Sequence, residues 1–207
     1  MRTMIAIPCM DSICTPTVIS LTGLQVTGEA KFAYSVSSLV YDSRNSLARQ
    51  AIMEGFDQVL WLDSDMTFDP DLLVRLESDL GEDKEMVSAL YVTRKGKIKP
   101  VVYDKCGYDH VSGTVEVIPY AHSYYDYPKD SLFECEAVGF GGVLMKTSLL
   151  KEVTNKYGLP FSPIMGFGED LSFCMRVRDM GKKIYCDSRV KMGHIGHHEF
   201  TEDDLRP

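Results

Sequence analysis

The chain has 207 residues, of which 44% are hydrophobic and 25% charged, values typical of one compact domain that buries its own core. Its 22 basic and 30 acidic residues give a formal net charge of −8, and no run of lysine or arginine is long enough to bind a phosphate backbone, so no nucleic-acid partner is expected. The longest nearly apolar stretch, residues 137–145, has about half the length of a membrane span, so no span is expected either.

The N-terminal sequence does not match a secretory signal, because two prolines and Asp11 interrupt the apolar core that a signal peptide needs. The six cysteines are scattered and contain no Cys-x-x-Cys pair. We therefore expect reduced thiols and a cytoplasmic location. A disulfide between Cys9 and Cys14 is the alternative that the spacing leaves open.

Apolar runs alternate with amphipathic segments in the first half of the chain, the pattern of βαβ units that build a mainly parallel sheet. The pattern predicts a strand at 3–8, a helix at 18–30, a strand at 31–37 and a helix at 43–55. Ser43 suits the N-cap of this second helix and Gly55 its end.

A strand at 58–62 follows, QVLWL, which is apolar after its first residue, as a strand covered on both faces should be. It ends at Asp63. The next helix is expected to begin at Asp69, with Pro70 in its first position, and a further strand is expected at 86–91. This part of the chain thus continues the alternation of strand and helix.

The pattern changes after residue 97 to short β-like runs, separated by expected turns at Gly107 and at Ser112-Gly113, which predicts an antiparallel excursion up to residue 134. The last third predicts a helix at 169–180, stopped by Gly181, and one or two closing strands within 183–196. The expected fold class is therefore α/β, with a mainly parallel mixed sheet flanked by helices in a single Rossmann-like domain.

Two carboxylates, Asp63 and Asp65, lie two residues apart directly after the apolar strand at 58–62. In extended backbone they point the same way, and the carboxyl ends of parallel strands border the ligand crevice of an open α/β sheet. Such oxygen ligands suit Mg²⁺ or Mn²⁺. The alternative is an ordinary turn, which Asp-Ser-Asp also favours, but Asp69 and Pro70 already organise the turn before the next helix.

At this point the chain resembles the GT-A glycosyltransferases of the broad family 2 type, whose Asp-x-Asp motif ends such a strand. Three more motifs carry the resemblance, which spans most of the chain. They are Arg44-Asn45 at the start of a helix, Gly141-Gly142 before an apolar strand, and Glu169-Asp170 opening a helix after Gly166-Phe167-Gly168. Each motif is weak alone, whereas their shared order is fairly specific.

The resemblance implies a single GT-A-like domain over residues 1–207, with a nucleotide-sugar half at about 1–95 and an acceptor half at about 96–207. It implies metal-dependent transfer of a sugar from a nucleotide-diphosphate donor to a hydroxyl acceptor, with inversion favoured. The implied partners are a nucleotide sugar, a UDP-sugar first, and a glycan or another hydroxyl acceptor. The implied cofactor is Mn²⁺ or Mg²⁺.

The resemblance also assigns roles to the metal side of the site. Asp63 and Asp65 would bind the cation, with Asp63 also facing the donor, and His194 would be a further ligand, as GT-A enzymes often have near the C-terminus. His194 is preferred to His197 and His198 because glycines bracket it, whereas the other two precede an acidic tail. A purely structural histidine is the alternative.

The remaining roles concern donor and acceptor. Arg44 and Asn45 would contact the nucleotide diphosphate from a helix start, and Asp11 would meet the base or ribose. Asp170 would be the general base, with Glu169 beside it, both ionised near neutral pH by the helix dipole. The plain alternatives are a surface ion pair for Arg44, with Asp42 or Glu54, and helix capping for the two acids.

Two other functions stay open on the sequence. Paired acids at a strand end serve a metal-dependent nucleotidyltransferase or phosphohydrolase equally well. The chain could also be a non-catalytic module that binds nucleotide sugars.

Overall fold

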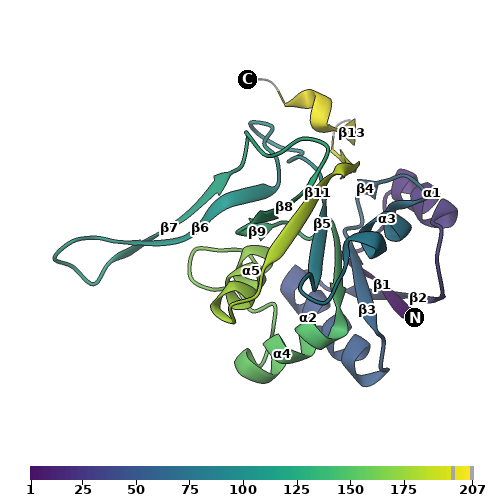
Figure 1. The fold of residues 1–207 in the computed structure, drawn as a ribbon, viewed down its shortest axis with the longest axis horizontal. Helices are drawn as coiled ribbons and strands as arrows, with labels where there is room; N and C mark the ends of the chain where they lie inside the picture. The colour runs from purple at the N-terminus through teal and green to yellow at the C-terminus, as the bar shows by residue number, and fades with distance from the viewer. Residues whose placement is uncertain (197–198, 206–207) are drawn as a thin grey trace.

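The computed structural model describes residues 1–196 and 199–205, and its centre is a seven-stranded sheet (Figure 1). In spatial order the strands are β2 (Glu29–Val36), β1 (Arg2–Cys9), β3 (Gln58–Leu62), β10 (Gly142–Lys146), β5 (Met86–Leu90), β11 (Ile184–Lys191) and β8 (Leu132–Cys135). All run in one direction except β10 and β8, which are antiparallel to their neighbours. The expected α/β class with a mainly parallel mixed sheet is confirmed.

Helices cover both faces of this sheet (Figure 1). The α-helices of the described residues are α1 (Thr15–Gly23), α2 (Val40–Met53), α3 (Leu72–Asp79), α4 (Thr147–Tyr157) and α5 (Glu169–Asp179), and a short 3₁₀ helix, η1 (Glu202–Asp204), lies near the C-terminus. Alternate residues of a strand point to opposite faces, so Met4 of β1 packs with α2, α4 and α5, whereas Ile5 packs with α1 and α3. Both faces of β1 and β3 are therefore buried, which explains their continuous apolar runs.

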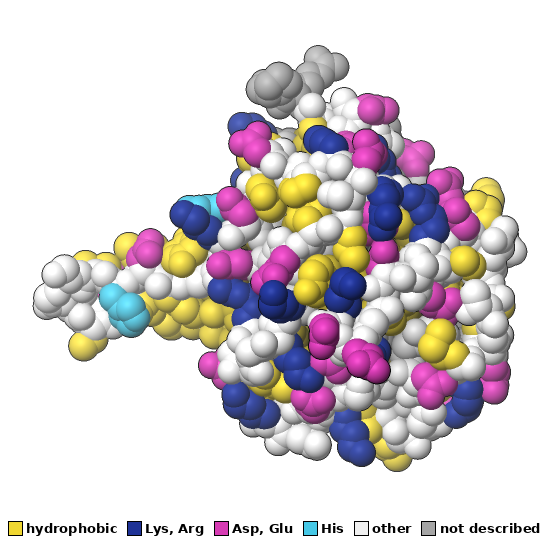
Figure 2. Space-filling model, in the orientation of Figure 1, with side chains coloured by type: hydrophobic (Ala, Val, Ile, Leu, Met, Phe, Trp, Pro, Cys, Tyr) yellow, Lys and Arg dark blue, Asp and Glu magenta, His cyan; other side chains and the backbone are white. Residues whose placement is uncertain are grey.

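Two smaller sheets complete the structure. One consists of β4 (Met66–Thr67), β12 (Gly193–Ile195) and β13 (Glu199–Phe200). The other contains β6 (Val102–His110), β7 (Val117–Ser123) and β9 (Ala137–Val138), and its β6–β7 hairpin projects from the body as a long arm with hydrophobic side chains along it (Figures 1 and 2). The expected antiparallel excursion is confirmed.

The hairpin turn differs from the expectation at one glycine. Gly107 lies inside β6, opposite Tyr120, and forms no turn. Gly113 does lie in the turn between β6 and β7, with a φ of +80° that glycine adopts without strain. A glycine in a strand can mark a close neighbour instead of a turn, and a Cβ on Gly107 would approach the Tyr120 ring.

The predicted helix at 18–30 is wrong in both boundaries. α1 begins at Thr15, because Pro16 suits the first helical turn, where its missing N–H costs no hydrogen bond. The helix ends at Gly23, and Glu29 already pairs with Arg2 in the parallel sheet. The parallel pairing of β2 with β1 thus places residues 29 and 30 in a strand, although local propensity favours a helix there.

The predicted start of the second helix is also too late. α2 begins at Val40, so Ser43 is not its N-cap but is buried one turn inside. Its end agrees with the expectation, since Gly55 follows with a φ of +68°. The helix expected from Asp69 likewise begins at Leu72, after a turn in which the Leu72 N–H donates to the Asp69 carbonyl.

All six cysteines are free thiols and lie within the part of the chain that the structure describes, so the Cys9–Cys14 disulfide is not formed. Burial raises the pKa of the Cys135 and Cys174 thiols well above the ordinary value. Among the described residues, no helix is both long and apolar enough to cross a membrane.

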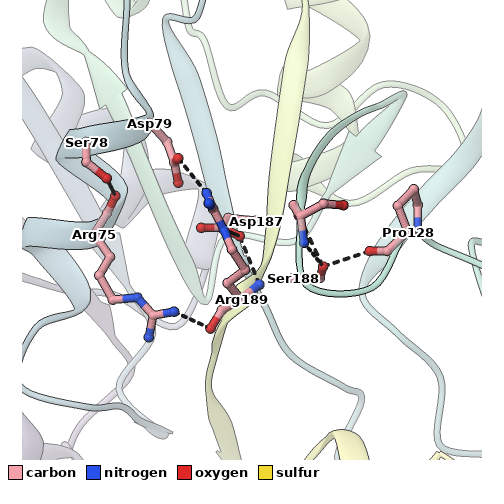
Figure 3. Close-up of polar contacts among 8 residues, drawn as sticks. Arg75, Ser78, Asp79, Pro128, Asp187, Ser188 and Arg189 are labelled. Atoms are coloured by element: carbon pink, nitrogen blue, oxygen red, sulfur yellow. Dashed lines mark hydrogen bonds and ion pairs between the residues drawn. The ribbon is translucent and has the colours of Figure 1, made fainter.

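A buried pair of acids, Asp79 and Asp187, joins the end of α3 to β11 (Figure 3). Arg189 donates from Nη2 to Asp79 Oδ1 (2.9 Å) and from Nε to Asp187 Oδ1 (2.8 Å). Arg75 donates to the Arg189 carbonyl, which adds a second link between the two elements. Burial and the neighbouring Asp187 carboxylate raise the pKa of Asp79 to about 6.

This pair predicts a measurable pH dependence of stability. The pKa of Asp79 is raised above its unfolded value of about 3.9, so the folded state takes up a proton between about pH 6 and pH 4 and becomes more stable as the pH falls through that window. We expect Asp79→Asn, which keeps the hydrogen bonds, to raise the free energy of unfolding at pH 7.5 by on the order of 1 kcal/mol. Urea unfolding at pH 7.5 and pH 5 measures this.

The difference between wild type and variant should fall to about half at pH 5 and vanish only below about pH 4, where Asp79 is protonated in both the folded and the unfolded state. Asp83→Asn, which removes an exposed acid just after α3, is the matched control and should change stability little at either pH. An Asp79→Asn protein less stable than wild type at pH 7.5 would contradict the prediction and mean that the charge pairing with Arg189 dominates.

Candidate functional site at the carboxyl edge of the sheet

A cavity of about 350 Å³ opens at the carboxyl ends of β1, β3 and β5. The open edge of such a sheet is where α/β folds bind ligands. Of the residues predicted from the sequence, the cavity is lined by Arg44, Asp63, Asp65, Glu169, Asp170 and His194. A larger hollow of about 630 Å³ lies beside β8 and the end of α5. The Lys and Arg side chains of its walls form ion pairs with Glu side chains, as Lys183 does with Glu134.

The backbone around the two aspartates is held by three distant segments. The Asp63 N–H donates to the Gly141 carbonyl (3.3 Å), the Cys14 N–H donates to the Ser64 carbonyl (2.8 Å), and the Ile195 N–H donates to the Asp65 carbonyl (2.8 Å). Ser64 and Asp65 form a turn and not the extended backbone assumed above. Both carboxylates nevertheless reach the cavity, because the turn is fixed in place by these bonds.

Arg44 forms the floor of the cavity. Its side chain is only 2% exposed, and it donates from Nη2 to Asp63 Oδ1 (2.6 Å) and from Nε to Glu169 Oε1 (3.1 Å). The guanidinium also lies 5.2 Å from the centre of the Phe140 ring. Burial disfavours the charge, but the facing carboxylates outweigh it and raise the pKa of Arg44. The plain alternative of a surface ion pair with Asp42 or Glu54 is therefore wrong.

Asp170 is the acid whose surroundings disfavour ionisation. It lies in the first turn of α5, with its Oδ1 accepting from the Leu171 N–H (2.7 Å). Burial, followed by the Glu169 charge, raises its pKa to about 6 despite that bond and the charge on Arg44. Asp170 is therefore still mostly ionised at neutral pH, as expected, although desolvation outweighs the effect of the helix start on its pKa. A pKa near 6 is useful for proton transfer.

Asp65 faces His194 and Arg94. His194 Nε2 lies 3.6 Å from Asp65 Oδ1, and Arg94 Nη1 forms an ion pair with Asp65 Oδ2. Although burial opposes ionisation, these two neighbours lower the pKa of Asp65. His194 Nδ1 lies 2.9 Å from the Val92 carbonyl, which can only accept, so Nδ1 carries a proton and Nε2 is the nitrogen that faces the carboxylate.

The donor set fits a divalent cation. Two carboxylates and an imidazole suit Mn²⁺, and a histidine that donates its other N–H to a backbone carbonyl is the usual arrangement for a metal ligand. Within the residues described, however, no three acidic, histidine or cysteine side chains are close enough to hold an ion as they stand. Arg44 pairs with Asp63 Oδ1 and Arg94 pairs with Asp65 Oδ2, so both aspartates already have a charged partner in this structure.

Two predicted donor-binding residues do not line the cavity. Asn45 is buried below it, where its Oδ1 accepts from the Phe161 N–H (2.9 Å) and ties α2 to the loop before α5. Its predicted contact with the nucleotide is wrong, because α2 begins one turn earlier and Asn45 faces the core. Asp11 is exposed and accepts from Ser12 Oγ (3.1 Å), whereas its neighbours Cys9 and Met10 line the cavity.

His197 and His198, the alternatives to His194, lie outside the described residues.

The glycine pair has a packing reason in this structure. Gly142 pairs with Leu62 where β10 enters the sheet beside the cavity, and a Cβ on it would overlap the Met192 sulfur. A Cβ on Gly141 would likewise press on Tyr91, whose hydroxyl accepts from the Gly141 N–H (3.1 Å). These glycines therefore let the backbone approach the core behind the site.

Sequence reasoning missed several residues that line the cavity. Tyr91 and Arg94 follow β5, and Phe140 precedes β10. Arg94 opens the run Arg-Lys-Gly-Lys-Ile-Lys just after an apolar strand, a local concentration of positive charge in an acidic chain that could have identified it. Ser37 and Ser38, after β2, also line the cavity and carry no such signal.

The chain is similar to known proteins in structure. No protein-family model matches it, and no curated protein matches its sequence. The structure of A197 from STIV is similar with a TM-score of 0.69 at 19% identity, covering 99% of this chain and 92% of that one. The structure of GalNAc-T7 with UDP, GalNAc and Mn²⁺ is similar with a TM-score of 0.60 at 12% identity. That match covers 94% of this chain, which spans 44% of the GalNAc-T7 chain, and at these identities the two likenesses show a shared fold.

Proposed function

We propose that this chain is a metal-dependent glycosyltransferase that moves a sugar from a nucleoside diphosphate donor to a hydroxyl acceptor. The observation that carries the proposal is the gathering of Asp63, Asp65, His194 and Asp170 in one cavity at the carboxyl edge of the sheet. The fold shared with GalNAc-T7, whose structure holds UDP, GalNAc and Mn²⁺, supports the same class of donor and cation.

In this proposal Asp63, Asp65 and His194 would hold Mn²⁺ or Mg²⁺, whose charge, when the ion is bound, offsets that of the departing diphosphate. Arg44 keeps Asp63 and Glu169 in place from below. The cavity wall formed by Cys9, Met10 and the segment after β2 borders the space for the nucleoside. A UDP-sugar is the first donor to test.

Asp170 is the proposed general base. Its carboxylate takes the proton of the acceptor hydroxyl as the oxygen forms a bond to the anomeric carbon, and the bond from that carbon to the diphosphate breaks. The nucleoside diphosphate leaves with the electron pair. Attack from the face opposite the leaving group inverts the anomeric centre.

The proposed metal site is tested by Asp65→Asn. Calorimetry should show that wild type binds UDP in the presence of Mn²⁺ and that the variant loses about tenfold or more in affinity, because a charged ligand becomes neutral. His194→Ala should weaken Mn²⁺ binding less, since it removes a neutral ligand. Thermal unfolding of the variants serves as the folding control.

Unchanged affinity in Asp65→Asn would remove Asp65 from the site. Product analysis separates the transferase from the other enzyme class, because sugar transfer releases a nucleoside diphosphate and nucleotidyl transfer releases pyrophosphate. Binding of UDP-sugars without any turnover would favour a non-catalytic module.

A further inference from the structure

A basic loop borders the candidate site after β5. Residues 93–99, Thr-Arg-Lys-Gly-Lys-Ile-Lys, carry four positive charges in a chain whose net charge is −8. The loop is closed at its base, because the Thr93 N–H donates to the Lys99 carbonyl (2.9 Å) and Thr93 Oγ1 donates to the Lys97 carbonyl (3.2 Å). The positive charge is therefore held beside a cavity rich in carboxylates.

Arg94 is the residue of this loop that enters the cavity. Its guanidinium pairs with Asp65 Oδ2 and donates to the Ile195 carbonyl (3.1 Å). The other oxygen of the same carboxylate, Oδ1, faces His194 Nε2. Arg94 thus neutralises Asp65, the carboxylate that the proposed cation would bind.

The two arginines of the site differ in their freedom to move. The Arg44 side chain is 2% exposed and is fixed between two carboxylates and aromatic rings, whereas the Arg94 side chain is 38% exposed and its contacts are to one carboxylate and one backbone carbonyl. An ion pair of this half-exposed kind contributes little to stability and exchanges readily. Arg94 is therefore able to leave Asp65 without disturbing the core.

We infer that Arg94 is an exchangeable counter-ion of Asp65: it holds the carboxylate in the metal-free protein, and it turns to the phosphates of a nucleoside diphosphate when a divalent cation takes its place. The inference rests on the proposed function. Its chemistry is ordinary for arginine, because a guanidinium presents a forked set of donors that matches phosphate oxygens as well as a carboxylate. Arg94 is a positioning residue for the metal and a binding residue for the phosphates.

The inference predicts opposite effects of one substitution on two ligands. In Arg94→Gln, the competitor for Asp65 is gone, so the affinity for Mn²⁺ alone should rise by about fivefold. This factor corresponds to the free energy of a partly exposed ion pair, about 1 kcal/mol. Affinity for UDP at saturating Mn²⁺ should fall by about tenfold, because a charge-assisted contact to phosphate is lost. Calorimetric titrations of Mn²⁺, and of UDP in excess Mn²⁺, measure the two constants.

Two variants control the experiment. Lys95→Gln removes the same charge from an exposed position of the same loop and should leave both constants within about twofold of wild type. Arg94→Lys keeps a charge near Asp65 and should bind Mn²⁺ like wild type while losing part of the UDP affinity, since lysine lacks the fork. Thermal unfolding confirms that each variant is folded.

The outcomes separate this inference from the proposed function. Asp65-dependent binding of Mn²⁺ to wild type, with no gain in Arg94→Gln, overturns the inference and leaves the proposed function standing. A fall in both affinities overturns it as well, because Arg94 would then only support the fold of the site. Absence of Mn²⁺ binding in wild type and in Arg94→Gln contradicts both.

Discussion

Replacing Arg44 by methionine is expected to destabilise the protein by about 3–5 kcal/mol, the usual result of removing one partner from a buried set of charges. Asp63 and Glu169 would lose the donors that they now accept from at 2.6 and 3.1 Å. Asp170 would lose the neighbouring positive charge of Arg44, which lowers its pKa, and three carboxylates would be left around an apolar side chain. Methionine retains most of the packing against Phe140, so the measured loss reports the charge and its hydrogen bonds.

Urea unfolding at pH 7.5 measures this effect. Arg49→Met provides the matched control, because Arg49 lies on the exposed side of the same helix, and its change should stay within about 0.5 kcal/mol. Lowering the pH should restore part of the stability of Arg44→Met, since protonation relieves the repulsion among the acids. A cost below about 1 kcal/mol at pH 7.5 would mean that water replaces Arg44 and that the floor of the site is not dry.

The elements around the site that could be predicted from the sequence are those with local signals. The strand ending at Leu62 is recognisable because both its faces are buried, and the start of α5 is marked by acids in its first turn and by the preceding glycines. Local signals also identified Asp63, Asp65, Glu169 and Asp170, which the structure brings to one cavity. Their chemical roles stay predictions.

Other features depend on pairing between distant segments and could not be predicted in this way. The apolar run of β10 does not reveal that it enters antiparallel between β3 and β5. α2 begins one turn before its predicted start, so Asn45 lies within the helix and faces the core instead of the ligand. The local positive charge marks Arg94, but its pairing with Asp65 could not be predicted because the two residues are distant along the chain.

The second large effect concerns Asp170. We expect Asp170→Asn to lower sugar transfer by about a hundredfold or more, because an amide takes no proton from the acceptor hydroxyl. The same change should make the metal-free protein more stable at pH 7.5, by on the order of 1 kcal/mol or more. The reason is that the folded-state pKa of about 6 lies above the unfolded value of about 3.9, so that ionised Asp170 weakens the folded state above about pH 6 and this penalty disappears as the pH falls towards 4.

Loss of function with a gain in stability distinguishes a base held in an unfavourable place from a helix cap. Glu169→Gln is the matched comparison, since it neutralises the neighbouring acid of the same helix turn but removes the charge opposite Arg44 Nε, so this variant should be less stable than wild type. Turnover of a UDP-sugar by wild type should fall as the pH drops through about 6, and this dependence should be absent from the residual activity of Asp170→Asn. If Asp170→Asn instead unfolds more easily than wild type and keeps transfer within a few-fold, Asp170 caps α5, and an inverting mechanism has to find its base in another residue of the cavity.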